Sequence, residues 1–210
     1  MERSNLIMYL ETQLSHFFPD GVDCRNDIEA HLDESLCRLE KCINAVRCWR
    51  KGQFDYLHSS QYCIFLYFLA NTIFEESGYS ATCTKLFLLN KALNGIDLFY
   101  EIAMPDIFFI GHSVGLVLAK AKYGNYLVLY QNATVGKNHG TAPTLGEGVI
   151  LYPNAAIIGN CHIGDGSVIA QGVSVINRDT PGNCFCFQGQ SGDLQFKPTE
   201  RSIIADFFRV

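Results

Sequence analysis

Aliphatic residues recur at every sixth position through much of the second half of the chain. The set is Leu145, Leu151, Ile157, Ile163, Ile169 and Val175, and small residues follow several of them four positions later, at Ala155, Cys161 and Ser167. A period of six matches neither the 3.6-residue period of a helix nor the two-residue period of a strand. It is typical of a three-sided coil in which each short side points one aliphatic side chain inward. The pattern therefore predicts a β-solenoid and not an ordinary buried strand or helix.

The repeat is interrupted once, and the interruption predicts a surface loop. Tyr123, Leu129 and Val135 keep the six-residue spacing, but the segment 136–144 is about four residues too long for the next side of the coil. A tightly stacked coil would extrude this excess, and loops on rigid scaffolds often carry functional residues. We expect His139, which lies in this segment, to project from the coil.

The first 95 residues show helical periodicity instead. Ile28, Leu32, Leu36, Leu39 and Ile43 recur at three- and four-residue steps, as the apolar face of an amphipathic helix does. Segments 65–73 and 83–93 predict two further helices, and Asn94-Gly95 is a typical end for the second. The chain is therefore predicted to be α+β: an α-helical domain over 1–95, a solenoid over 96–183 and a C-terminal tail over 184–210.

Composition and charge narrow the class of protein. Of 210 residues, 48% are hydrophobic and 18% are charged, which is enough apolar surface for a packed core. The net charge of −5 gives no basic footprint for nucleic acid. No window reaches the roughly 18 apolar residues of a membrane span, and the N-terminus lacks the apolar core of a signal peptide. The nine cysteines follow no metal-binding or disulfide pattern, so we expect buried thiols, no metal and a cytoplasmic protein.

Two of the six histidines stand out by their surroundings. His112 lies between Gly111 and Gly115, and glycines let a ligand approach the backbone closely. His139 lies in the predicted loop. A neutral imidazole suits proton transfer near pH 7. Both histidines lie near predicted turns of the coil, from which they could reach a cleft formed with an adjacent subunit.

Several segments resemble the serine acetyltransferase family. Residues 95–98 (Gly-Ile-Asp-Leu) and 111–115 (Gly-His-Ser-Val-Gly) are similar to its G-V-D-I-H-P and L-D-H-A-T-G motifs, and Asp97 and His112 keep the family's fifteen-residue separation. Residues 130–136 resemble its L-Q-S-V-T-L-G, and residues 143–149 resemble its P-K-I-R-E-G-V. The resemblance covers most of the chain and is loose over the first fifty residues.

The resemblance implies a left-handed parallel β-helix that uses acetyl-CoA as co-substrate. Such coils generally form homotrimers with active sites between subunits, and in serine acetyltransferases the helical half joins two trimers, so a dimer of trimers is an open alternative here. His112 would act as general base on the acceptor hydroxyl, as the mapped histidine does. Asp97 would orient its imidazole, as the acid of a catalytic triad does. His139 is a further catalytic candidate.

The resemblance also implies where acetyl-CoA would bind. A backbone amide near Gly136 is a candidate donor to the developing oxyanion. The pantetheine arm would run along the coil past Pro153, Asn154, Ala170 and Gln171, although the family has small residues at two of these places.

Departures from the family pattern bear on the acceptor. The family's aspartate before the catalytic histidine is Gly111 here, and its Arg-His pair before the proline of H-P-K-I is Thr141-Ala142. An amino acid needs charged partners at both ends, or its desolvation is costly. We therefore predict O-acetylation of a sugar, as in a capsule or O-antigen precursor. The alternative is serine O-acetylation for cysteine biosynthesis, with His139 replacing the missing histidine.

Two readings from other classes stay open. β-Helix carbonic anhydrases hold zinc with three histidines, and His112, His139 and His162 are the only candidates on this coil, but they lack a short paired spacing. The second is a noncatalytic assembly module, in which the coil is a scaffold and the helices recruit a partner. The family-like spacing of Asp97 and His112 argues weakly against it.

Overall fold

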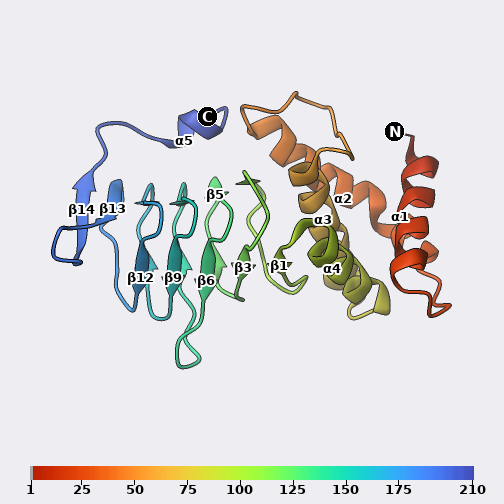
Figure 1. Ribbon diagram of the computed structural model, residues 1–210. Coiled ribbons are helices and arrows are strands. Elements are labelled where there is room, and N and C mark those ends of the chain that lie inside the picture. The colour runs from red at the N-terminus through yellow and green to blue at the C-terminus, as the bar shows by residue number, and fades with distance from the viewer. Residues whose placement is uncertain (1) are drawn as a thin grey trace.

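The helical domain occupies one end of the molecule. The structure is a computed structural model that describes residues 2–210, and its first four helices are α1 (Arg3–Phe17), α2 (Arg25–Ala45), α3 (Ser59–Ser77) and α4 (Ala81–Asn94). Helix α3 is central: every residue from Ser60 to Ile73 is buried, and α2 and α4 pack against it (Figure 1). Its apolar sequence explains this position, because a helix that is hydrophobic all round must be covered on all sides.

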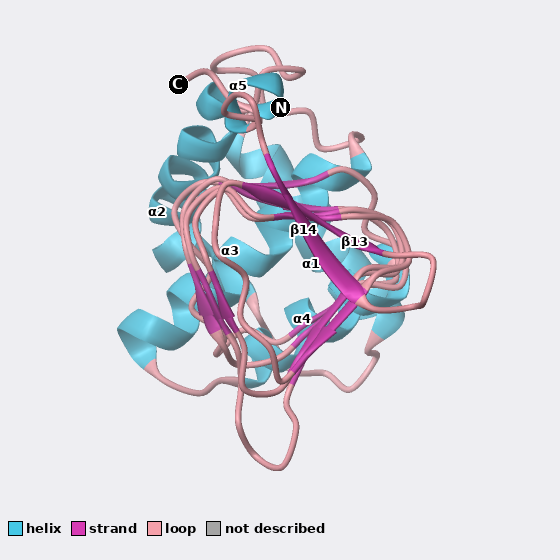
Figure 2. Ribbon diagram, turned by 90° about the vertical axis from the view of Figure 1, so that its left-hand side faces the viewer, coloured by secondary structure: helices cyan, strands magenta, loops and turns pink. Residues whose placement is uncertain are grey.

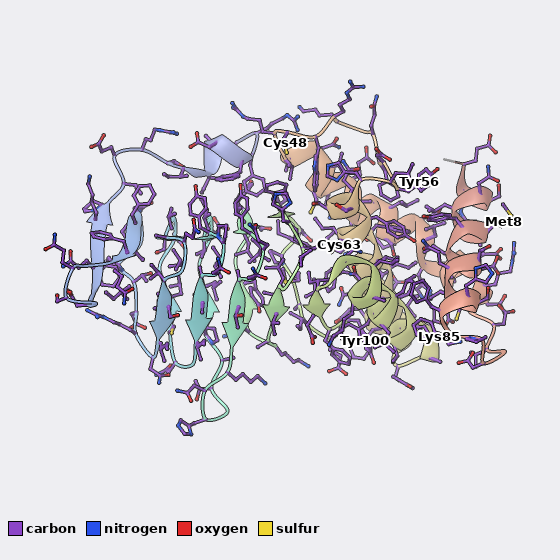
Figure 3. All side chains as sticks on the ribbon, in the orientation of Figure 1. Met8, Cys48, Tyr56, Cys63, Lys85 and Tyr100 are labelled. Carbon is purple, nitrogen blue, oxygen red and sulfur yellow. The ribbon has the colours of Figure 1, made fainter. Side chains whose placement is uncertain are left out.

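Side-chain hydrogen bonds tie the helices to one another and to the coil. The Lys85 ammonium donates to the Asp20 carboxylate at 2.6 Å, so this buried lysine has a partner. Figure 3 labels Lys85 among the side chains of the helical domain. The Asn71 amide donates to the Tyr100 carbonyl at 2.7 Å, which fixes the first turn of the coil against α3. Helix α4 ends as the sequence predicts, with Gly95 in the left-handed region at φ 64°.

From Asp97 onward the chain winds into short parallel strands that form three sheets. The β1 sheet contains β1 (Asp97–Leu98), β3 (Val117–Leu118), β6 (Thr134–Gly136), β9 (Ala156–Ile158) and β12 (Ser174–Ile176). The β2 sheet contains β2 (Phe108–Ile110), β5 (Leu127–Leu129), β8 (Ile150–Leu151), β11 (Val168–Ile169), β13 (Cys184–Gln188) and β14 (Leu194–Pro198). The β4 sheet contains β4 (Lys122–Tyr123), β7 (Thr144–Leu145) and β10 (His162–Ile163). The sheets are the sides of a triangle in cross-section (Figure 2).

The six-residue repeat has the predicted role. Leu129, Leu151 and Ile169 are in register along the β2 sheet, as Leu145 and Ile163 are in the β4 sheet. All six aliphatics of the repeat are at most 2% exposed. The small residues that follow them, Ala155, Cys161 and Ser167, are buried at the turns. The prediction of helices followed by a parallel β-helix is confirmed.

The extruded loop is also present. Residues 137–143 project from the coil between β6 and β7 (Figure 1). Asn138 and Thr141 exchange two backbone hydrogen bonds, of 2.9 and 3.0 Å, so the loop is a tight hairpin. His139 and Gly140 form its tip, both at positive φ.

The C-terminal tail does more than close the coil. Strands β13 and β14 form an antiparallel pair at the open end, as a cap would. The chain then returns toward the helical domain, and helix α5 (Ile204–Phe207) is followed by a bridge between Val46 and Phe208 (Figure 1). The sequence pattern predicts a C-terminal tail over 184–210 but not its return to the helical domain. Within residues 2–210, none of the helices combines the length and hydrophobicity needed to cross a membrane.

Candidate functional site

The predicted base lies at the corner between the β2 sheet and the β1 sheet. We call this edge the Gly111 corner; it consists of residues 111–116, 130–133, 152–155 and 170–173 on successive turns. Backbone hydrogen bonds from Gly111, Tyr130 and Tyr152 to the next turn set the register, at 2.9 to 3.1 Å. Gly111, Tyr130, Tyr152 and Ala170 therefore form one row along the coil.

The backbone of this corner is built from residues that tolerate the left-handed region. Gly115, Asn132, Asn154 and Gly172 occupy equivalent places on the four turns, with φ of 74°, 59°, 62° and 74°. Glycine and asparagine adopt this conformation at low cost. The Asn132 amide also donates to the Asn154 side-chain oxygen at 3.1 Å. The corner is thus regular over four turns.

His112 is exposed at this corner and its backbone is held from both sides. The Ser60 hydroxyl donates to the Gly111 carbonyl at 3.3 Å, and the Ser113 hydroxyl donates to the Asn94 carbonyl at 2.7 Å. Among the described residues, no side chain forms a hydrogen bond with the imidazole of His112. The ring is therefore accessible to a hydroxyl acceptor, and its centroid lies 6.5 Å from that of Tyr130.

Asp97 lies on the neighbouring turn but is paired elsewhere. Its amide donates to the Leu116 carbonyl at 2.8 Å, which puts β1 beside the segment that follows His112. Its carboxylate accepts from the Lys91 ammonium at 2.6 Å, and no hydrogen bond joins it to His112 in the part of the chain described. The Asp97–His112 pair that the family resemblance implies therefore stays a prediction.

The other predicted residues divide between two corners. Pro153, Asn154, Ala170 and Gln171 all lie on the Gly111 corner, on the turns beyond Tyr130. Gly136 ends β6 and His139 is at the tip of the loop that follows, so both belong to the corner between the β1 and β4 sheets. A single chain does not bring Gly136 or His139 to His112.

Sequence reasoning missed the aromatic part of the site. The rings of Tyr130 and Tyr152 stack at 5.5 Å with an interplanar angle of 16°, and Phe207 packs edge-on against Tyr130 at 6.4 Å. Burial raises the pKa of Tyr130, so its phenol stays neutral through the physiological range. A signal existed: the two tyrosines are separated by one turn of the repeat plus the excess of the loop.

The histidines do not form a metal centre. Within residues 2–210, no group of three or more His, Cys, Asp or Glu side chains is arranged to hold a metal ion. His162 lies on β10 in the β4 sheet, on neither the turn nor the corner of His112. Tetrahedral zinc sites need ligands that converge on one point.

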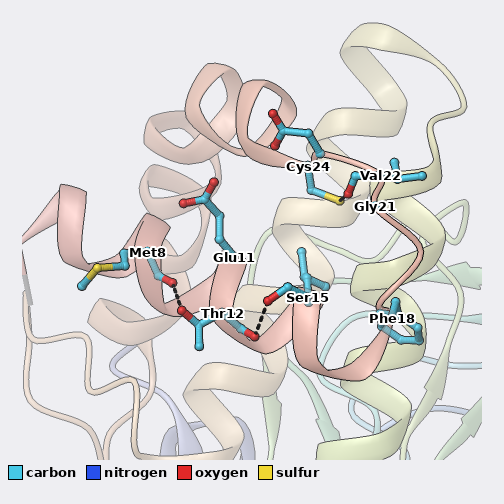
Figure 4. A pocket seen from close by; sticks show the side chains of 10 residues that line it. Met8, Glu11, Thr12, Ser15, Phe18, Gly21, Val22 and Cys24 are labelled. Carbon is cyan, nitrogen blue, oxygen red and sulfur yellow. Dashed lines mark hydrogen bonds between the residues drawn. The ribbon is translucent and has the colours of Figure 1, made fainter.

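A surface hollow in the helical domain lies far from this corner. It is formed by α1 and the segment leading to α2, with Met8, Glu11, Ser15, Phe18 and Val22 among its lining (Figure 4). The hydroxyls of Thr12 and Ser15 donate to carbonyls of α1 itself. Its polar side chains are thus satisfied locally, and we assign it no role in the chemistry.

Comparison with known proteins finds a matching family over part of the chain and several similar proteins. Residues 142–177 match the family described as "Bacterial transferase hexapeptide (six repeats)". The serine acetyltransferase of Synechococcus elongatus is 34% identical over 104 residues, which are 46% of this chain and 41% of that protein. The serine acetyltransferase of Bacillus subtilis is 25% identical over 132 residues, 59% of this chain and 58% of that protein.

This chain is similar to serine acetyltransferases and contains a hexapeptide-repeat segment. It spans about half the length of the curated relatives it matches, 41% and 58% of the two above. Its fold is similar to those of solved serine acetyltransferases. The enzyme of Neisseria gonorrhoeae in complex with serine superposes with a TM-score of 0.69 at 16% identity. This superposition covers 94% of this chain and 84% of that one. A serine acetyltransferase in complex with CoA has a TM-score of 0.65 at 16% identity, over 82% and 75%.

The similarity to serine acetyltransferases and the parallel β-helix both agree with the predictions from sequence. Every curated relative described above is named for serine, so the similarity favours the alternative acceptor over the sugar reading. None of them is named for a polysaccharide.

Proposed function

We propose that the protein is an acetyl-CoA-dependent O-acetyltransferase in which His112 is the general base. The observation that carries the proposal is the exposed imidazole at the Gly111 corner, on a coil similar to those of serine acetyltransferases. An alcohol is a poor nucleophile and needs a base within hydrogen-bond reach. Among the described residues, His112 is the histidine that has both this exposure and the family's motif around it.

The proposed reaction is a direct transfer. His112 takes the proton of the acceptor hydroxyl as its oxygen attacks the thioester carbonyl of acetyl-CoA. The new C–O bond forms, the C–S bond breaks, and the imidazolium returns the proton to the leaving thiolate. Asp97 would stabilise the imidazolium and hold its tautomer.

The complete site is proposed to need a second copy of the chain. Gly136 and His139 lie on a different corner from His112, so they can act with it only across a subunit interface. A homotrimer, with the corner of one subunit facing the loop of the next, satisfies this requirement. Sedimentation of the full chain tests it: a trimer or hexamer supports the shared site, and an active monomer overturns it.

Two acceptors have support. L-Serine is supported by the names of the relatives and by the serine bound in the Neisseria structure. A sugar hydroxyl is supported by one specific feature of this chain: apart from His112, the residues of the Gly111 corner are uncharged. Acetyl transfer itself is common to both candidates.

The test is acetyl-CoA consumption, followed as free thiol, with L-serine and then with a panel of sugars. We expect thiol release that depends on the acceptor and that His112→Ala lowers by about a hundredfold or more, as loss of a general base would. Thiol release that is equal in the variant would exclude His112 as the base.

A further inference from the structure

A short segment between α2 and α3 carries three cations that have no acidic partner. We call residues 46–51 the Arg47 rim. Arg47, Arg50 and Lys51 are all exposed, and residues 44–54 contain no Asp or Glu. Among the described residues, none of the three forms an ion pair, although the chain as a whole has a net charge of −5. The rim is therefore a positive patch on an acidic protein.

The C-terminal tail holds the backbone of the rim in place. The Arg47 amide donates to the Phe207 carbonyl at 2.7 Å. The Arg209 guanidinium donates to the carbonyls of Val46, Arg47 and Trp49 at 2.5–2.9 Å. The backbone oxygens of the rim are thus bound to the tail, while its three cationic side chains remain exposed on a fixed support.

One carboxylate near the rim already has a cationic partner. Arg201 donates to both carboxylate oxygens of Asp206, at 2.8 and 2.9 Å. This hydrogen bonding is the main cause that lowers the pKa of Asp206, and the charge of Arg47 makes a smaller contribution. Arg47 therefore stays available to a ligand.

The rim lies beside the Gly111 corner. The Trp49 indole packs edge-on against the Phe109 ring, with ring centroids 5.5 Å apart, and Phe109 is in β2, three residues before His112. Burial raises the pKa of Tyr130, and the Cys48 thiol is near enough to add to this shift. Figure 3 labels Cys48 where the helical domain meets the coil. An acceptor that extends from His112 toward the helical domain would therefore meet the rim.

We infer that the Arg47 rim binds the anionic group of a sugar acceptor, a phosphate or a carboxylate, while a hydroxyl of the same molecule lies at His112. Guanidinium groups bind both kinds of anion through paired, charge-assisted hydrogen bonds. The loop that the proposed trimer would bring to this corner adds Lys137, which is also exposed. A neutral sugar gains nothing from these charges and L-serine carries no net charge, so both should bind more weakly than an anionic sugar.

Binding at the rim can be measured without turnover. Trp49 is the single tryptophan of the chain and lies within the rim, so its fluorescence reports on this surface. The full chain is titrated with α-D-glucose 1-phosphate, D-glucuronate and D-glucose. We expect a saturable change with at least one of the two anionic sugars, none with D-glucose, and a Kd that rises with added NaCl because salt screens the charges. Tighter binding of the phosphate or of the carboxylate sugar says which anion the rim prefers.

Variants locate the binding on the rim. The triple variant Arg47→Gln/Arg50→Gln/Lys51→Gln should raise the Kd of the anionic sugar about tenfold or more, because charge-assisted hydrogen bonds are lost. Lys122→Gln, at an exposed lysine of β4, is the matched control and should leave the Kd within twofold of wild type. No fluorescence change with either anionic sugar, or a Kd that the triple variant leaves unaltered, would overturn the inference.

The inference rests on the proposed acetyl transfer, and thiol release separates the two. The sugar that binds is offered as acceptor with acetyl-CoA, and the triple variant should raise its KM while leaving kcat and the KM for acetyl-CoA within twofold. Binding without any thiol release would contradict the acetyl transfer and leave the rim as an anion-binding surface. A triple variant that raises only the KM for acetyl-CoA would overturn the inference, because the rim would then bind the phosphates of the co-substrate.

Discussion

At the scale of single residues, Gly111 marks where this chain departs from the family motif. The change from aspartate to glycine looks in the sequence like the loss of a binding group. The structure adds that the vacated volume is filled by the ring of Tyr130. A sequence motif reports which side chain is absent, but what replaces it comes from a different turn of the coil.

Gly111→Ala should destabilise the protein by about 1–3 kcal/mol, the usual cost of forcing a methyl group into filled space. Its φ is not in the left-handed region, so the cost is steric. Gly136→Ala is the control, because a Cβ there would meet nothing closer than 3.5 Å. Urea unfolding measures both; equal stabilities for the two variants would mean that Tyr130 does not fill this space.

A double-mutant cycle identifies the contact. In a Tyr130→Ala background the space over residue 111 is empty, so adding Gly111→Ala should cost little. An interaction energy near zero, with Gly111→Ala equally costly in both backgrounds, would contradict the steric coupling.

At the scale of elements, the turns of the Gly111 corner depend on a repeated left-handed residue. Asn154→Ala should cost about 1–2 kcal/mol, because alanine at φ 62° is strained and the hydrogen bond from Asn132 is lost. Asn154→Gly loses the same hydrogen bond without the strain, so it should cost clearly less. Thermal unfolding of the two variants and the wild type measures these costs. Equal destabilisation by alanine and by glycine would contradict backbone strain at residue 154.

The inward-facing residues of the coil could be predicted from the sequence, whereas the contacts between outward-facing residues could not. The six-residue repeat predicted the inward aliphatics, the small residues at the turns and the extruded loop, because each turn of the coil repeats the same local geometry. It did not predict which outward residues meet. Tyr130 and Tyr152 become neighbours only when the register across the loop is known, and Asp97 meets Lys91 because α4 ends beside the first turn.

At the scale of the whole molecule, the C-terminal tail joins the coil to the helical domain. Phe208 is fully buried against Tyr126, and the Arg209 amide donates to the Ala45 carbonyl at 2.8 Å. The Arg209 guanidinium donates to four carbonyls, those of Asn44, Val46, Arg47 and Trp49, at 2.5–3.0 Å. The partners are about 160 residues apart in sequence, so no local pattern could have predicted this contact.

Phe208→Ala should lower the free energy of unfolding by about 3–5 kcal/mol, as burial of a phenyl ring is lost and a cavity is left. Val210→Ala, at a side chain that is 72% exposed, is the matched control and should change it by no more than about 0.5 kcal/mol. Urea unfolding monitored by circular dichroism measures both. A Phe208→Ala variant as stable as the control would mean that the tail does not hold the two parts together.

We propose that His112 carries out proton transfer in an acetyl transfer from acetyl-CoA. The most direct measurement compares the rate of thiol release in His112→Ala with that in His162→Ala, at saturating acetyl-CoA and with whichever acceptor the wild-type chain uses. Both histidines are exposed on the coil, but His162 lies on the β4 sheet, away from the Gly111 corner. We expect the rate to fall about a hundredfold or more in His112→Ala and to stay within twofold of wild type in His162→Ala. Equal rates in the two variants would contradict the role of His112 as the base.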